Sequence, residues 1–430
     1  MRLTHFTLPL FTALLLAGCA APTGPQAPAA SDEYVMTVQT PDPALSNAQL
    51  SARYGGAVVI RTPNFALLRV VGGPLRSAAL ERDPDVTVER NADVFRVLNF
   101  NSSGTIGLWG SGTIGLWGSG TIGLWGSGTI GLWGSGSGAS AANTANYAEY
   151  TSIGLDAAQA RITAQGRTPG MGVTIAVIDT GVDLNHPAFA GRLSPVHTWK
   201  DFVDNDDQPQ DQGQMGSGAV GHGSEVAGLS LTVAPGARVM PLRVLDEQGQ
   251  GDVDDLAQAI VWAADHGANV INLSLGAGVP VQAVTQAIQY ANALGAVVVA
   301  SAGNQGWEGL DYPAAEFGLT SANLAVGSVN HAGSKSSFSQ YGSLTLLAPG
   351  EGMVGPAPEG QAAAWSGTSM SAPLVAGSVA LAMTHGPARS AANSTERLKA
   401  TAQNIGDLSG NAGYTGKLGV GRIDLDALTR

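Results

Sequence analysis

The chain of 430 residues is longer than one hydrophobic core usually organises, so we expect two or three folded units. Hydrophobic residues make up 44% of it and charged residues only 13%, a composition that excludes disorder over most of the length. The formal net charge of -12 argues against a nucleic-acid partner, because a phosphate-binding surface needs clustered Lys and Arg.

The start of the chain has the pattern of a signal peptide, which we assign to residues 1–18. Arg2 precedes an apolar stretch, residues 6–16, that is too short to cross a membrane. The run Leu-Ala-Gly-Cys ending at Cys19 resembles a bacterial lipobox, which implies cleavage before Cys19 and a lipid on that residue. The alternative is an ordinary secretory signal with an incidental Cys. Cys19 is the single cysteine, so no disulfide forms within the chain, and residues 19–33 read as a tether.

Residues 34–98 alternate short strands and short helices in the order β-α-β-β-α-β. That order suits a small ferredoxin-like α+β module. The predicted elements are a strand at Tyr34–Gln39, a helix at Pro43–Arg53, a hairpin at Ala57–Val71, a helix at Pro74–Arg82 and a strand at Val86–Arg96.

Residues 99–150 form a Gly-rich segment with an internal repeat. The octapeptide Thr-Ile-Gly-Leu-Trp-Gly-Ser-Gly occurs four times in tandem, beginning at Thr105, Thr113, Thr121 and Thr129. Three glycines per unit work against a stable helix or strand, which favours a linker expanded by repetition. The alternative is that Leu and Trp make each unit a substrate-like or adhesive segment that lies extended in a cleft.

Residues 151–430 alternate apolar strands with amphipathic helices. Nearly continuous apolar runs are typical of parallel strands covered on both faces. The predicted strands are Val173–Ile178, Val239–Leu245, Val270–Leu275, Ala296–Ala300, Leu324–Val329 and Leu344–Ala348, and two clear helices are Asp254–His266 and Val281–Leu294. This pattern predicts an open α/β sheet with helices on both faces, whose functional site lies at the carboxyl ends of the strands.

Three short motifs in this part carry side chains suited to nucleophilic chemistry. Asp179 closes an apolar strand in Ile-Asp-Thr-Gly, His222 opens a helix in Gly-His-Gly-Ser-Glu-Val-Ala-Gly, and Ser369 lies in Gly-Thr-Ser-Met-Ser-Ala-Pro. Asp-Thr-Gly also occurs in aspartic proteases, but that mechanism needs two such carboxylates, which only a homodimer of this chain would supply.

Together the three motifs, in the order Asp, His, Ser, resemble those of the subtilase family, and the resemblance covers residues 153–430. It implies a subtilisin-like serine endopeptidase in which Ser369 is the nucleophile. His222 would be the general base and then the general acid, and Asp179 would orient its ring. Asn304, in Ser-Ala-Gly-Asn, matches the residue whose side-chain amide stabilises the oxyanion.

The same resemblance implies where a peptide substrate binds. A substrate backbone would pair with an edge segment, and side-chain pockets would supply specificity. The edge segment consists of Ser274, Leu275 and Gly276. Ala302 and Gly303 would line the first pocket, with Asp311 near its base. If Asp311 points inward, the pocket favours a basic residue; the alternative is a surface position.

The chemistry requires no cofactor, but a structural calcium ion is an open question. After Gly228 the chain reaches Ala234 almost at once, so the calcium loop that many subtilases carry there is expected to be absent. Ser224 and Glu225 stand where Thr and His are commoner. Conversely, residues 201–210 resemble a calcium loop of some thermostable relatives, with the alternative of a solvated acidic loop. The candidate ligands are Asp201, Asp204, Asp206, Gln208 and Gln210.

The resemblance also assigns the module at 34–98 as an inhibitory propeptide, acting on the catalytic domain at 151–430. We expect a monomer that acts on proteins or peptides and reaches the membrane only through the lipid on Cys19. Cleavage between Val97 and Ile153 would release the enzyme from a lipid-anchored precursor in the cell envelope; without cleavage the enzyme stays tethered. A non-enzymatic lipoprotein of the same fold would be expected to lack a triad residue, and an esterase would need Gly-x-Ser-x-Gly, which is absent.

Overall fold

The structure is a computed structural model that describes residues 33–71, 83–91, 95–96, 107–109, 145–386 and 390–430. The predicted signal peptide, the lipobox and nearly all of the tether lie outside these residues, as does most of the repeat segment. Residues 32–430 belong to one compact unit. Within the described residues, no helix has both the length and the apolar character needed to cross a membrane.

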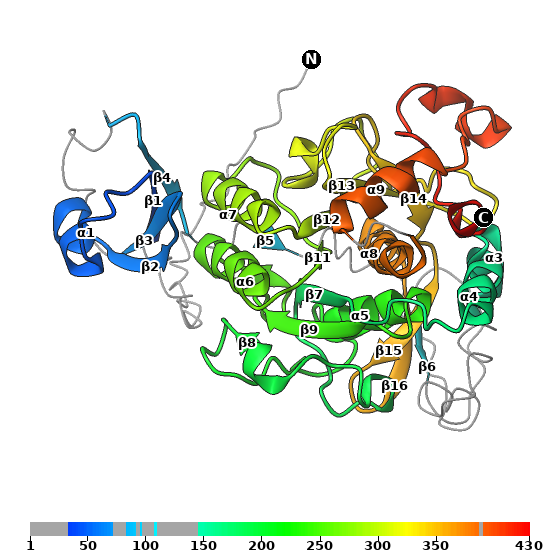
Figure 1. Cartoon of the computed structure of the whole chain (residues 1–430), viewed down its shortest axis with the longest axis horizontal. Helices are drawn as coiled ribbons and strands as arrows, with labels where there is room; N and C mark the ends of the chain where they lie inside the picture. The colour runs from blue at the N-terminus through cyan, green and yellow to red at the C-terminus, as the bar shows by residue number, and fades with distance from the viewer. Residues whose placement is uncertain (1–32, 72–82, 92–94, 97–106, 110–144, 387–389) are drawn as a thin grey trace, which may run out of the picture. The chain divides into compact units, whose positions relative to one another are not determined.

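A parallel seven-stranded sheet forms the centre of the larger part (Figure 1). Its strand order is β14-β13-β12-β11-β7-β9-β8, so the first strand of this part, β7, lies inside the sheet. The strands are β7 (Thr174–Asp179), β8 (Lys200–Asp201), β9 (Arg238–Arg243), β11 (Val270–Leu273), β12 (Val297–Ser301), β13 (Leu324–Val329) and β14 (Leu346–Pro349). All six predicted strands are present, and every limit lies within two residues of the predicted one.

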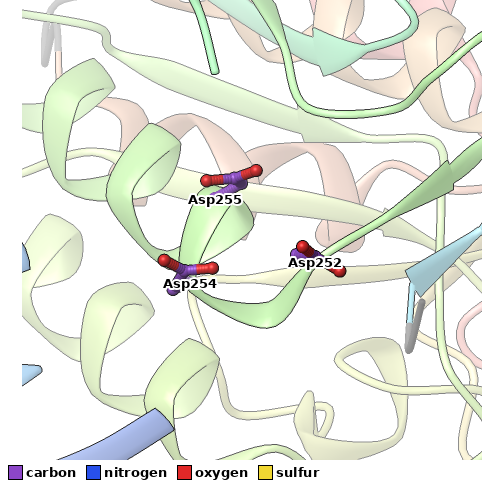
Figure 2. A group of neighbouring side chains, drawn as sticks. All are labelled: Asp252, Asp254 and Asp255. Atoms are coloured by element: carbon purple, nitrogen blue, oxygen red, sulfur yellow. The ribbon is translucent and has the colours of Figure 1, made fainter. Parts of the chain in front are cut away.

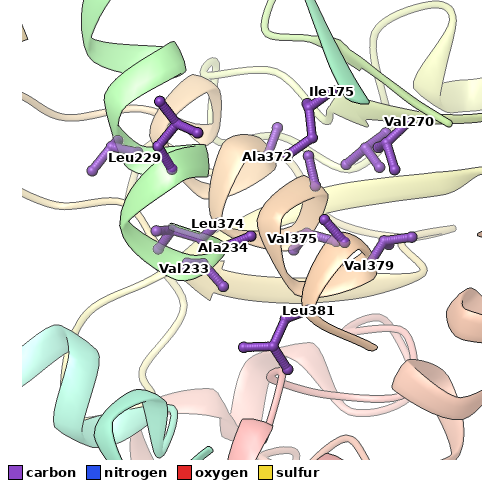
Figure 3. Close-up of a cluster of buried hydrophobic side chains, with 14 of the residues drawn as sticks. Ile175, Leu229, Val233, Ala234, Val270, Ala372, Leu374, Val375, Val379 and Leu381 are labelled. Carbon is purple, nitrogen blue, oxygen red and sulfur yellow. The ribbon is translucent and has the colours of Figure 1, made fainter. Parts of the chain in front are cut away.

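Helices cover both faces of this sheet because successive side chains of a strand point to opposite sides. Ile175 of β7 packs in one cluster with α5 (His222–Val233) and α8 (Thr368–His385), as Figure 3 shows. Ala176, the next residue, packs in a second cluster with α6 (Val253–Asp265) and α7 (Gln282–Ala293). The sheet is therefore buried on both sides, which explains its nearly continuous apolar sequence.

Shorter elements surround the sheet. The remaining helices are α3 (Tyr147–Ser152), α4 (Leu155–Ala164), α9 (Ala391–Ala400) and α10 (Leu425–Thr429), with short 3-10 turns at 187–189, 196–198, 314–316 and 409–414. A hairpin of β15 (Met353–Ala357) and β16 (Gln361–Trp365) leads into α8, and β6 (Gly107–Trp109) pairs with β16. The two-residue strands β5 (Phe95–Arg96) and β10 (Gln250–Gly251) pair with each other.

The N-terminal module is an antiparallel four-stranded sheet with the order β2-β3-β1-β4. Its elements are β1 (Glu33–Gln39), α1 (Asn47–Tyr54), β2 (Ala57–Arg61), β3 (Phe65–Val71) and β4 (Val86–Arg90). One face packs on α1, through residues such as Met36 and Leu50, and the other packs, through Phe65 and Leu67, in the cluster that contains α6 and α7. Both faces of this sheet therefore pack against helices.

Two predicted elements of the module need correction. The first helix begins at Asn47 rather than Pro43, because the side chain of Ser46 accepts a hydrogen bond from Gln49 and forms a capping box. The last predicted strand is divided: 86–90 completes the four-stranded sheet, whereas 95–96 pairs with β10. The predicted helix at Pro74–Arg82 lies outside the described residues.

Candidate active site

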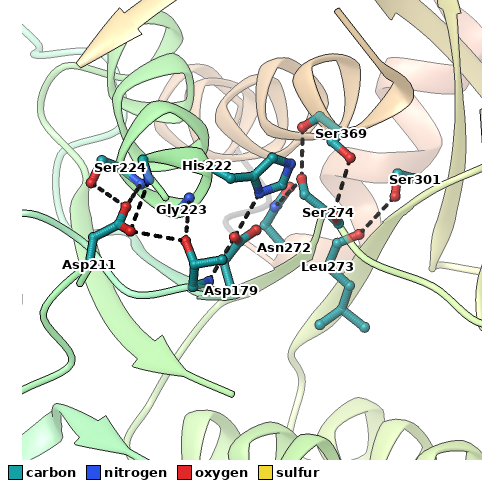
Figure 4. A network of polar contacts seen from close by, with 12 residues as sticks. Asp179, Asp211, His222, Gly223, Ser224, Asn272, Leu273, Ser274, Ser301 and Ser369 are labelled. Carbon is teal, nitrogen blue, oxygen red and sulfur yellow. Dashed lines mark hydrogen bonds and ion pairs between the residues drawn. The ribbon is translucent and has the colours of Figure 1, made fainter. Parts of the chain in front are cut away.

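A buried carboxylate and a buried imidazole meet at the carboxyl end of the sheet (Figure 4). Asp179 is the last residue of β7 and His222 is the first residue of α5. His222 Nδ1 lies 2.7 Å from Asp179 Oδ1, which also accepts the backbone N–H of Thr180 at 2.8 Å. Because a carboxylate can only accept, Nδ1 carries the proton and the other ring nitrogen, Nε2, is left as an acceptor.

Ser369 is the second residue of α8 and lies across from the imidazole (Figure 4). Its hydroxyl donates to the carbonyl of Ser274 at 3.1 Å, and the Ser274 hydroxyl donates to the carbonyl of Ser369 at 2.8 Å. His222 Nε2 has no hydrogen-bond partner among the described residues. The serine and the imidazole are therefore brought together without a hydrogen bond between them, a looseness common in sites without substrate.

The side chain of Asn304 is oriented by the residue before the serine. Its Oδ1 accepts from the backbone N–H of Thr368 at 2.8 Å and from the Thr368 hydroxyl at 2.9 Å. This leaves Nδ2 as the donor end of the amide, and it lies on the side of Gly367, where a Cβ would come within 3.1 Å of it. The amide donor therefore lies next to the turn that presents Ser369.

A second carboxylate, Asp211, holds the first turn of α5 in place. It accepts the backbone N–H groups of Gly221 at 3.0 Å and Ser224 at 3.2 Å, and the Ser224 hydroxyl at 2.7 Å. The Thr180 hydroxyl oxygen accepts the N–H of Gly223 at 3.0 Å. These contacts satisfy donors that a helix start leaves open, and burial raises the pKa of Asp211 to about 7. Sequence reasoning missed Asp211, because only the folded loop brings it to the helix.

The sequence did not place two further residues, Trp365 and Glu225, near His222. The ring of Trp365, at the end of β16, contacts the imidazole edge-on with centroids 5.4 Å apart. Glu225, one turn after His222, is fully buried, and burial raises its pKa well above the usual range. A Cβ at Gly355 would come within 2.5 Å of the Glu225 side chain, so β15 packs directly on it. The sequence marked Glu225 only as a departure from the family pattern.

The structure brings one of the predicted substrate-binding residues, Ser274, against Ser369. Ser274 contacts Ser369 directly, and the segment continues to Ala277, which exchanges backbone hydrogen bonds with Tyr312 at 2.9 and 2.8 Å. This bridge ties the predicted edge segment, in which Leu275 and Gly276 are buried, to the loop that carries Asp311.

Asp311 is not at the surface. Its exposed fraction is 5%, and it accepts a hydrogen bond from Gln340 Nε2 at 3.2 Å. Gly303 has a φ of +115°, and a Cβ there would lie 2.9 Å from an oxygen of Asp311. Asp311 also donates its backbone N–H to Ala302 at 2.9 Å. The carboxylate is therefore directed toward Gly303, with the Gln340 side chain beside it, and its place in a substrate pocket stays a prediction.

The five predicted calcium ligands each have hydrogen-bond or ion-pair partners within the protein. Arg243 Nη1 lies 2.8 Å from Asp201 and 2.6 Å from Asp204, so a guanidinium supplies the positive charge in this loop. Asp206 accepts the backbone N–H of Gln208 at 2.7 Å, while the Gln210 side-chain oxygen accepts that of Leu184 at 3.1 Å. The loop is closed by its own hydrogen bonds and by Arg243, whose guanidinium lies where a cation would meet Asp201 and Asp204, and calcium binding here stays a prediction.

The one group of three close carboxylates in the described part of the chain lies at the start of α6 (Figure 2). Asp252, Asp254 and Asp255 gather there, and Arg69 of the N-terminal module pairs with Asp254 and, at 3.2 Å, with Asp255. Burial, followed by the charge of Asp254, raises the pKa of Asp255 to about 7. Arg69 provides the compensating charge, which makes the cluster a contact of the module.

A buried carboxylate and imidazole, a serine at a helix start and a neighbouring amide donor define a serine hydrolase site. A model of the subtilase family matches residues 170–421, more than half of the chain. The chain therefore belongs to the subtilase family and is a subtilisin-like serine endopeptidase. This assignment excludes the aspartic-protease alternative for Asp179.

Individual relatives agree with the family. Thermitase of Thermoactinomyces vulgaris is 41% identical over 266 residues, covering 59% of this chain and 88% of that protein. Subtilisin Savinase of Lederbergia lenta is 34% identical over 271 residues, covering 61% and 92%. The crystal structure of a cold-adapted subtilisin-like serine proteinase, 33% identical, matches with a TM-score of 0.50 over 58% of this chain and 89% of that chain.

Proposed function

We propose that the chain hydrolyses peptide bonds with Ser369 as nucleophile, His222 as general base and Asp179 as the residue that orients the imidazole. The observation that carries the proposal is the 2.7 Å contact between His222 Nδ1 and Asp179, which leaves Nε2 as an acceptor on the side of Ser369. No cofactor takes part in the proposed chemistry.

The reaction follows from these positions. His222 Nε2 takes the proton of the Ser369 hydroxyl as the oxygen attacks the substrate carbonyl. Asn304 Nδ2 and the backbone N–H of Ser369 donate to the oxyanion that forms. The imidazolium then gives its proton to the leaving amine, and water hydrolyses the acyl-enzyme by the same route.

Asp311 supports a preference for Lys or Arg on the amino side of the cleaved bond. The residue is 5% exposed and its carboxylate lies next to Gly303, so a cationic side chain in the pocket would meet a poorly hydrated carboxylate. We expect Asp311→Asn to lower kcat/KM for a Lys peptide at least about tenfold while changing that for a Phe peptide by less than about threefold. An equal change for both peptides would leave specificity to other residues.

The N-terminal module is proposed as an inhibitory propeptide because it binds the starts of α6 and α7. Glu89 accepts the backbone N–H groups of Gln282 at 2.7 Å and Ala283 at 3.1 Å. The side-chain oxygen of Asn91 accepts the backbone N–H of Asp254 at 3.1 Å. A carboxylate at a helix start is favoured by the helix dipole, so these contacts hold the module through groups that water also satisfies after release.

The proposed cleavage site lies within residues 97–106, which are outside the described residues. The strand before them, β5, pairs with β10, which follows the end of β9 beside Asp179. The strand after them, β6, pairs with β16, which leads through Trp365 to Ser369. The residues on either side of the proposed cleavage site are thus paired with β10 and with β16. Cleavage there would leave the lipid of Cys19 with the module and release a monomeric enzyme outside the cell.

Time-resolved intact mass of the chain from Ser31 onward tests the function and the processing together. The unaltered chain should separate into two fragments with a boundary in residues 97–106, and Ser369→Ala should stay whole. Fragmentation of both would assign the cut to another protease. If neither fragments and a serine-reactive probe fails to label Ser369, the proposed catalysis is refuted. The lipid is tested separately, by a mass shift of the expressed precursor that Cys19→Ser removes.

A further inference from the structure

The repeat segment has one described contact with the rest of the molecule. Gly107, Leu108 and Trp109, from the first copy of the octapeptide, form β6 and extend the β15–β16 hairpin to three strands. The pairing is antiparallel, with Gly107 opposite Ala364 and Trp109 opposite Ala362. In the described part of the chain β16 has no other strand on this side, so β6 is what covers its edge.

Pairing along a strand edge depends on backbone N–H and C=O groups rather than on a particular side chain. The paired part of β16 is three alanines, Ala362 to Ala364, whose small side chains admit many partners. The Gly-Leu-Trp of β6 recurs unchanged at 115–117, 123–125 and 131–133. Whatever makes the first copy fit this edge is therefore present in the other three.

We propose that the edge of β16 is a docking site for Gly-Leu-Trp and that the four copies are interchangeable occupants of it. The site holds the repeat segment on the strand that runs into Trp365, whose ring contacts His222. One copy at a time occupies the edge, and four equivalent copies raise the docked fraction relative to one. The proposal does not depend on peptidase activity.

In the uncut chain, a docked copy is connected on one side to β5 and on the other to α3. The lengths of these two connections give none of the four copies a large advantage. Docking the first copy closes connections of ten residues (97–106) to β5 and 37 residues (110–146) to α3. Docking the fourth closes connections of 34 residues (97–130) and 13 residues (134–146). Closure probability falls with about the 3/2 power of each length, and the shorter connection compensates for the longer, so the four copies stay within a factor of about two.

Disulfide trapping in the full chain tests the proposal without relying on catalysis. The background is Cys19→Ser, which removes the single native thiol, with Ser369→Ala and Ala364→Cys. Into it we would place Gly107→Cys, Gly115→Cys, Gly123→Cys or Gly131→Cys, one at a time, which keeps every Leu and Trp. Residues directly opposite on antiparallel strands are close enough for a disulfide. The matched controls are Gly112→Cys and Gly120→Cys, at the last residues of the first two octapeptides, which lie between successive Gly-Leu-Trp segments.

After mild oxidation, all four variants should form the disulfide with yields within about twofold of one another and several times those of the controls. Trapping of Gly107→Cys alone would overturn the interchange of copies, and yields equal to the controls would overturn docking. If Ala364→Cys does not fold, amide exchange at Ala362–Ala364 replaces it. Replacing Leu by Pro, which has no backbone N–H to pair, in one copy should then leave protection intact, whereas replacing it in all four copies should remove it; any other pattern would overturn the proposal.

Discussion

The central sheet and the N-terminal sheet bury their side chains to different extents. Every residue of β11, β12 and β13 is buried, and so are the first sixteen residues of α8. In the N-terminal module β4 has no buried residue, and its own core of buried side chains is six residues, Met36, Val38, Leu50, Tyr54, Ala66 and Leu68.

The contacts between the two parts are also of a different kind. Apolar side chains such as Phe65 pack on the α6–α7 face, but the directed contacts are made by Glu89, Asn91 and Arg69 at helix starts. Water can replace these polar partners, whereas nothing replaces the packing between α8 and the central sheet. This difference supports the proposal that the module is released from a scaffold that carries the active site.

The largest expected effect is at the scaffold's nucleophile. Ser369→Ala should lower kcat by about 10⁶-fold, the magnitude known for this change in a subtilisin, because no other group can take over the covalent step. Thermal unfolding should be nearly unchanged, since the change removes one hydrogen bond to Ser274. Peptide hydrolysis and a melting curve measure the two effects. Residual activity above about 1% would contradict the assignment of the nucleophile.

A smaller loss is expected at the amide donor. Asn304→Leu should lower kcat by about 10²- to 10³-fold with little change in KM, as found for the corresponding donor in a subtilisin, because the amide acts on the oxyanion rather than on the bound substrate. Steady-state kinetics on one peptide would show this. Glu308→Gln, at an exposed position of the same loop, is the control and should keep most of the activity; equal losses would point to a disturbed loop instead.

A change at Asp211 tests whether its hydrogen bonds to the start of α5 hold His222 in position. Asp211→Ala leaves several N–H and O–H donors at the start of α5 without an acceptor, so we expect kcat/KM to fall about 10- to 100-fold through a displaced imidazole. Asp207, an exposed carboxylate of the same loop, is the control, and Asp207→Ala should be nearly neutral. A loss of stability with unchanged kinetics of the folded fraction would count against this role.

The smallest expected effect concerns the contact of the module. Arg69→Met should weaken the module's hold on the enzyme by about two- to fivefold at pH 8, since the pair is partly exposed. Because the pKa of Asp255 is raised to about 7, its charge is present above pH 7 and is lost as the pH falls through 7. The difference between Arg69→Met and the unaltered chain should therefore shrink at pH 6.

The onset of activity after cleavage, recorded at both pH values, measures how fast the module leaves. Arg61 is the matched control, because its side chain bonds only within the module, to Asn47 and Asp42. Arg61→Met should leave the onset unchanged. If the onset of activity differs between Arg69→Met and the unaltered chain by as much at pH 6 as at pH 8, Asp255 does not contribute to the contact.

Local pattern in the sequence predicted six of the seven strands of the central sheet, all but the two-residue β8, and the places of three functional residues. An apolar run ending in Asp179 and small-residue helices opening at His222 and near Ser369 are visible without a structure, because a buried parallel strand and a helix start have characteristic neighbours. The predicted limits of α6 and α7 differ from the observed ones by one residue, since Gly267 and Gly295, both with positive φ, end them.

Long-range contacts decided the rest. The role of Asp211, which lies in a polar loop, depends on a helix that begins eleven residues later. Arg243 reaches Asp201 and Asp204 only because β8 and β9 pair. The acidic loop at 201–210 shows the same limit of local sequence. Its oxygen atoms were visible in the sequence, but the guanidinium that meets them comes from another strand.

By itself, then, the amino-acid sequence determined the α/β class, the order of its strands along the chain and the motifs around Asp179, His222 and Ser369, because these depend on near neighbours. Only the tertiary structure decided that Asp311 faces Gly303, that residues 95–96 pair with β10 and that a repeat pairs with β16. Such contacts join segments far apart in the chain, and their free energy depends on geometry that local sequence does not contain.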